Sequence, residues 1–90
     1  MLLGEDHIST LASVNNLAFL YVRQSRFAEA EPLYVDCLAR VRVLLGENHS
    51  STLVSVNNLA SLYEKQSRYA ESEPLYVDCL AKKRKLLNEE

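Results

Sequence analysis

The sequence predicts an all-α protein made of tandem antiparallel helix-turn-helix repeats that stack into a short α-solenoid. Three observations predict this class. When the 90-residue chain is shifted by 42 positions, residues 3–44 align with residues 45–86, and 31 of the 42 positions are identical. Within each copy, apolar residues recur at spacings of three and four. The chain is rich in helix-forming residues and contains only two glycines and two prolines. We expect one array over residues 1–90, with repeat 1 at about 3–44 and repeat 2 at about 45–86.

The first helix of each repeat is predicted over about 8–23 and 50–65. One face of it is apolar, and we expect that face to form the core. Its residues in repeat 1 are Leu11, Val14, Leu17, Ala18 and Tyr21.

The second helix of each repeat is predicted over about 27–45 and 69–87. Its apolar face in repeat 1 comprises Phe27, Ala30, Leu33, Tyr34, Cys37, Leu38 and Val41. The short polar turn 24–26 makes the two helices antiparallel neighbours. Gly46 ends the helix of repeat 1 because glycine tolerates left-handed backbone, and Asn88 takes the matching position in repeat 2.

Leu17-Ala18-Phe19-Leu20-Tyr21, together with Ala30 and Tyr34, resembles the tetratricopeptide repeat. The 42-residue period resembles the kinesin-light-chain type more narrowly, through Gly-Glu-x-His, Asn-Asn-Leu-Ala-x-Leu-Tyr and Ala-Glu-x-Glu-Pro-Leu-Tyr. Similar repeats occur in nephrocystin-like and NB-ARC-linked proteins. The resemblance implies a protein-binding scaffold whose asparagines face a bound peptide. Ser25 and Ser67 depart from the pattern by replacing the turn glycine, which is expected to lower stability.

The differences between the two copies indicate a candidate binding groove. Four of them in the first helix, Ala12/Val54, Phe19/Ser61, Val22/Glu64 and Arg23/Lys65, fall on an arc away from the predicted core. In stacked helical-pair repeats the first helices line the concave surface, and exposed Phe19 and Val22 would form a small apolar patch there. Neutral drift of an exposed face is the alternative reading. The candidate groove residues are Asn15, Asn16, Phe19, Val22, Arg23, Asn57, Asn58, Ser61, Glu64 and Lys65.

A second group of differences lies at the end of the second helix, where Arg40-Val41-Arg42-Val43 becomes Lys82-Lys83-Arg84-Lys85. We expect Val41 and Val43 to pack on the following repeat, and the lysines to solvate the end of the array. A localisation or nucleic-acid role for the basic cluster is the alternative.

Two functions follow from this organisation. The first is a scaffold that binds a peptide or partner protein on the concave face. The second is a structural element that forms homo-oligomers by repeat stacking or helix swapping. Residues 1–3 look like the tail of a helix from an upstream repeat, so the N-terminal end is expected to be uncovered, either in an excised piece or in a self-associating chain.

The sequence gives no reason to expect an enzyme, a cofactor or a metal site. His7 and His49 lie one repeat apart and are expected to act in loops or as helix N-caps. Cys37 and Cys79 are expected to be buried and too far apart for a disulfide, with a reactive thiol as the alternative. A net charge of -2 and a pI near 5.7 give no general attraction to nucleic acid or membrane, and no apolar run could span a bilayer. We therefore expect a cytoplasmic protein.

Overall fold

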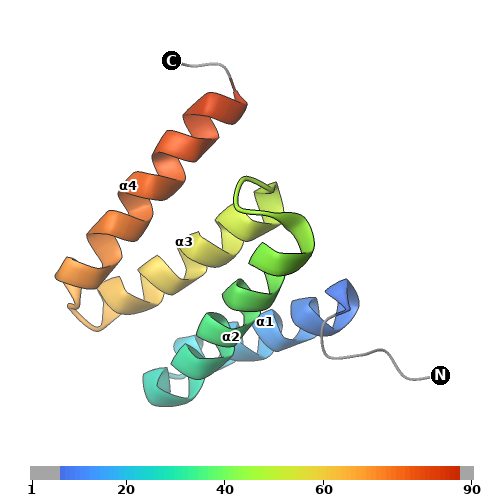
Figure 1. Cartoon of the computed structure of the whole chain (residues 1–90). Helices are drawn as coiled ribbons and strands as arrows, with labels where there is room; N and C mark the ends of the chain where they lie inside the picture. Colours follow the sequence, from blue (N-terminus) through green and yellow to red (C-terminus); the bar gives the residue numbers. More distant parts are fainter. Residues whose placement is uncertain (1–6, 88–90) are drawn as a thin grey trace.

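The computed structural model describes residues 7–87, which form four α-helices joined by short turns. The helices are α1 (Ile8–Arg23), α2 (Phe27–Leu45), α3 (Ser50–Lys65) and α4 (Tyr69–Leu86) (Figure 1). The prediction of an all-α helical repeat is confirmed. The expected helix bounds hold to within one residue, at the end of α4. Asn88 and residues 1–3, to which the sequence assigned a cap and an upstream helix, lie outside the described residues.

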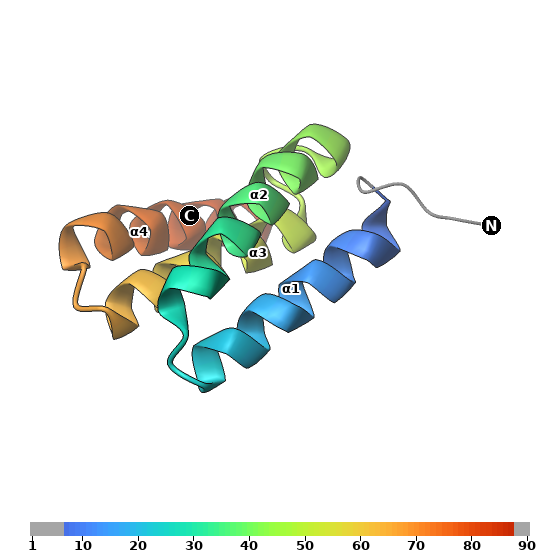
Figure 2. The same cartoon turned by 90° about the horizontal axis from the view of Figure 1, so that it is seen from below.

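The helices pack in chain order, α1 on α2, α2 on α3 and α3 on α4. Figure 2 shows α1 and α3 in one layer and α2 and α4 in the other. The chain is a slab of 44 × 33 × 16 Å. The inner helices α2 and α3 therefore each pack closely against a helix on either side, whereas α1 and α4 each pack closely against one.

Both first helices begin at a histidine. The Nδ1 atoms of His7 and His49 accept hydrogen bonds of 3.0 Å from the backbone N–H groups of Ser9 and Ser51. A helix leaves its first N–H groups without intrahelical partners, and an acceptor at the N-cap satisfies one of them. The predicted N-cap role of the two histidines is confirmed.

Both helical hairpins turn through a serine with positive φ, 60° at Ser25 and 61° at Ser67. In repeat 1, Arg26 N donates to Tyr21 O at 2.8 Å and Ser25 N donates to Val22 O at 2.9 Å. This pair of bonds is the Schellman motif, whose left-handed position usually holds glycine. Serine therefore adopts a backbone conformation that costs L-residues energy, as the sequence indicated.

The core contains both cysteines. Cys37 and Cys79 are free and buried, and their thiols donate to the carbonyl oxygens of Leu11 and Leu53 at 3.6 Å. Burial raises the pKa of the Cys37 thiol, because an ionised sulfur would lose its hydration. The expected structural burial of these cysteines is confirmed.

Two core assignments need correction. Leu17 was expected in the core but is 42% exposed, whereas its counterpart Leu59 is 6% exposed. The α2 helix covers Leu59, and no described residue covers the same side of α1. Val41 is buried at 5%, but it lies in a cluster with Leu11 and Cys37 of its own repeat rather than with residues of the following repeat, and Val43 is 85% exposed.

Candidate partner-binding groove

The exposed sides of α1 and α3 form one surface, because these helices share a layer (Figure 2). A hollow of about 200 Å³ opens between the first halves of the two helices. Its walls and floor are formed by Ile8, Leu11, Ala12 and Asn15 of α1, Cys37, Val41 and Leu45 of α2, and Ser51, Val54 and Ser55 of α3. Pockets that enclose a cofactor or drug-sized ligand hold roughly 300–1,000 Å³. This mainly apolar hollow instead suits one or two side chains of a partner.

An amide pair bridges the two helices beside the hollow. Asn58 Nδ2 donates to Asn15 Oδ1 at 3.2 Å, a side-chain hydrogen bond between repeat 2 and repeat 1 on this face. Each amide has four hydrogen-bonding positions, so the pair retains free donors and acceptors. Asn16 and Asn57, the other two asparagines expected here, are exposed.

The apolar wall continues along α1. Ala12, Asn15 and Phe19 are spaced by three and four residues and lie on one side of the helix. Phe19 is 53% exposed, and the guanidinium carbon of Arg23 lies 6.0 Å from the centre of its ring. The predicted exposure of Phe19 is confirmed.

The matching end of α3 is more polar. Ser61, at the position of Phe19, is half-buried, and Lys65, at the position of Arg23, is exposed. Among residues 7–87, Lys65 forms no ion pair. The groove therefore has an apolar hollow at one end and two basic side chains at the other.

The prediction that Val22 is exposed is wrong. Val22 is 8% exposed and belongs to the core cluster that contains Tyr34 of α2. Its counterpart Glu64 accepts a 2.9 Å hydrogen bond from Tyr76 Oη, so this position faces the second helix of its own repeat. Burial, followed by the bond to Glu64, raises the pKa of Tyr76.

The hollow also contains residues that sequence reasoning left out. Val54 is 53% exposed and Ile8 is 47% exposed, both at the hollow, and Ala12 lines it too. The signal for two of them was present, since Ala12/Val54 is one of the differences between the copies. These two positions were not predicted to line the groove, because a helical wheel shows which residues share a face of one helix and not where the neighbouring helix leaves a gap.

The described residues contain no group of three or more His, Cys, Asp or Glu side chains placed to hold a metal ion. Within the same residues, every helix is too short or too polar to cross a membrane. Residues 8–85, nearly the whole chain, match a protein-family model described as the tetratricopeptide repeat. No curated protein matches the chain.

Proposed function

The chain belongs to the tetratricopeptide repeat family, whose repeats generally mediate protein–protein interaction and typically form non-enzymatic scaffolds. From this we propose that the chain binds a peptide segment of a partner protein along the face formed by α1 and α3. The observation that carries the proposal is the apolar hollow between these helices, with the Asn15–Asn58 amide pair beside it.

The geometry of the groove supports a particular kind of peptide. The distance along α1 from Ala12 to Arg23 is about 16 Å at 1.5 Å per residue, which an extended chain covers in about five residues. An apolar side chain fits the hollow, exposed Asn16 and Asn57 can bond the peptide backbone, and an acidic group complements Arg23 and Lys65. The proposed ligand is therefore an extended segment with an apolar residue and an acidic residue about five positions apart.

Two finer assignments belong to the same proposal. The repeated Asn-Asn-Leu-Ala-x-Leu-Tyr motif supports the kinesin-light-chain-like type, since its second asparagine in repeat 2, Asn58, lies at the groove. The free thiols of Cys37 and Cys79 suit a reducing compartment such as the cytoplasm.

A peptide selection tests the groove. Peptides from a random displayed library are selected on the immobilised chain, and the binding of the best ones is measured against three variants. Val54→Asp places a charge in the hollow, and the double variant Phe19→Ala/Asn57→Ala removes an apolar contact and an amide. The matched control is Val43→Asp, at an apolar position that is 85% exposed on α2.

We expect both groove variants to raise Kd at least tenfold, while Val43→Asp leaves it unchanged. All four substituted positions are at least half exposed or polar, so thermal stability should change little. Equal binding by wild type and Val54→Asp, or an equal loss in the α2 control, would show that the ligand binds elsewhere.

Self-association is the second candidate function. The observation that favours it is the exposure of apolar side chains at both ends of the array, where the junction between the repeats buries their counterparts.

A further inference from the structure

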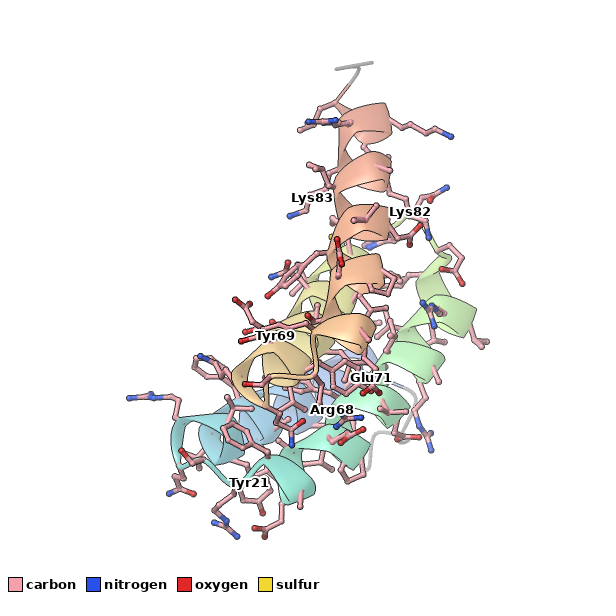
Figure 3. The ribbon with its side chains drawn as sticks, turned by 90° about the vertical axis from the view of Figure 1, so that its left-hand side faces the viewer. Tyr21, Arg68, Tyr69, Glu71, Lys82 and Lys83 are labelled. Atoms are coloured by element: carbon pink, nitrogen blue, oxygen red, sulfur yellow. The ribbon has the colours of Figure 1, made fainter. Side chains whose placement is uncertain are left out.

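The junction between the two repeats contains a charged socket made by Tyr63 and Arg68. Arg68, in the turn before α4, lies over the ring of Tyr63 with its guanidinium carbon 4.3 Å from the ring centre. Its Nη1 donates to Glu31 Oε1 of α2 at 2.8 Å, and its Nη2 donates to Glu71 Oε2 at 2.7 Å. Figure 3 shows Arg68 and Glu71 side by side at this turn. A carboxylate of one repeat thus enters a socket of the next repeat.

The same socket occurs at the N-terminal end of the array. Arg26 lies over Tyr21 at 4.3 Å and pairs with Glu29 at 2.6 Å, as Arg68 does with Tyr63 and Glu71. Within residues 7–87, no carboxylate from another repeat reaches Arg26.

The C-terminal end carries the complementary carboxylate. Glu73 occupies in α4 the position that Glu31 occupies in α2, and it is exposed. It forms no ion pair with any residue that the structure describes. The two ends of the array therefore carry the two halves of the charged contact that the middle of the array completes.

The apolar surfaces around these charges are complementary in the same way. Leu38 of α2 is 4% exposed because α3 covers it, whereas its counterpart Leu80 of α4 is 51% exposed. On the opposite end, Leu20 of α1 is 46% exposed and its counterpart Leu62 is fully buried. Because the repeats are nearly identical in sequence, α4 presents to solvent the surface that α2 presents to α3, and α1 presents the surface that receives it.

We propose that the chain stacks head to tail on a second copy of itself, with α4 of one copy against α1 of the next. In this contact, Glu73 of one copy enters the socket formed by Tyr21 and Arg26 of the other. The proposal rests on the second candidate function and is independent of the peptide groove. Because the two surfaces differ, the contact is heterologous and can be repeated from copy to copy. Each added copy would align its α1 with α3 of the copy before and so lengthen the groove.

One part of the C-terminal surface differs from the internal junction. Lys83 stands where Val41 is buried, and Figure 3 shows Lys82 and Lys83 on opposite sides of α4. Lys82 pairs with Asp78 at 3.1 Å, whereas Lys83 is exposed. A lysine can cover apolar surface with its stem but keeps its ammonium in water. The contact between copies is therefore weaker than the internal one and depends on protein concentration.

Charge reversal tests the geometry directly. The molar mass of the chain is measured by light scattering across a roughly hundredfold range of concentration, where mass action must reveal a reversible contact. The variants Arg26→Glu and Glu73→Arg each place like charges at the contact. An equimolar mixture of the two restores opposite charges at both kinds of junction.

We expect the wild-type mass to rise with concentration, each charge variant to remain monomeric, and the mixture to regain association. Leu80→Lys should also abolish association, because it places a charge on the apolar surface of α4 without touching the socket. Val43→Lys is the matched control and should associate like wild type. Circular dichroism establishes that each variant is folded.

Two results would overturn the proposal in distinguishable ways. A wild-type chain that stays monomeric throughout removes self-association and the stacking with it. A wild type that associates while the mixed variants do not shows that copies meet through another surface. Peptide binding, measured separately, is unaffected by either result.

Discussion

Leu20 and Leu62 occupy the same position in the two repeats, yet their surroundings differ. Leu62 in α3 is fully buried, whereas Leu20 in α1 is 46% exposed. If stacking of one repeat on the next causes this difference, replacing each leucine by alanine must have unequal effects on the free energy of unfolding. The two variants make the same chemical change in helices of almost the same sequence, so each serves as the control for the other.

The structure sets the size of the two effects. Truncating a fully buried leucine to alanine costs about 3–5 kcal/mol, because transfer energy is lost and a cavity remains. At Leu20 about half of the side chain already contacts water and no closed cavity forms, so the cost is about 1 kcal/mol. For a domain of this size, 1 kcal/mol lowers Tm by about 4–8 °C. We therefore expect Leu62→Ala to melt at least 10 °C below wild type and Leu20→Ala to remain within several degrees of it.

Urea unfolding followed by far-ultraviolet circular dichroism measures both free energies, at a protein concentration where the chain is monomeric. The m-values must match that of wild type for the comparison to hold. Equal destabilisation by the two variants would refute the reasoning, because it would mean that α2 does not protect Leu62 from water.

Three further predictions test local features. Ser67→Gly relieves the left-handed strain at φ 61°. Glycine is also more flexible in the unfolded chain, which offsets part of this gain, so thermal unfolding should show the folded state stabilised by about 0.5–1 kcal/mol. Ser67→Ala should give no gain. His49→Ala removes the acceptor for Ser51 N–H and should cost about 1 kcal/mol in urea unfolding, whereas His49→Asp should retain the cap; an unchanged His49→Ala variant would show that this hydrogen bond contributes nothing. Because burial raises the pKa of Cys37 in the folded state, its contribution to stability is present below the unfolded pKa of about 8.5 and is lost as pH rises through the folded value. Chemical unfolding from pH 7 to 10 should show this loss, and it should be smaller in Cys37→Ala.

The fold could be predicted from the sequence because the same apolar spacing and turn residues occur in both copies and indicate the same helix bounds. The periodicity could not assign the apolar residues of the first helix to particular neighbours. That helix has one apolar stripe for its own repeat, which contains Leu11, Ala18 and Val22, and another for the preceding repeat, which contains Leu17 and Leu20. On a helical wheel centred on Val14, these two stripes cannot be distinguished from each other. The wheel therefore placed Leu17 in the core and Val22 outside it.

The site was partly predictable for a related reason. The differences between the copies identified the exposed arc that carries Phe19 and Val54. The differences between the copies do not indicate the register between α1 and α3, which places Asn15 beside Asn58 and leaves the hollow between the helices. That register depends on how α2 packs between the two helices, and no pattern within a single helix reports it.

The most direct test of the proposed function is an NMR titration of the ¹⁵N-labelled chain with a selected peptide. Binding in the groove predicts that the largest chemical-shift changes fall on α1 and α3, at Asn15, Phe19, Val54 and Asn57. Changes that cluster instead on α2 and α4, around Val43 and Val77, would place the partner on the opposite layer and contradict the account.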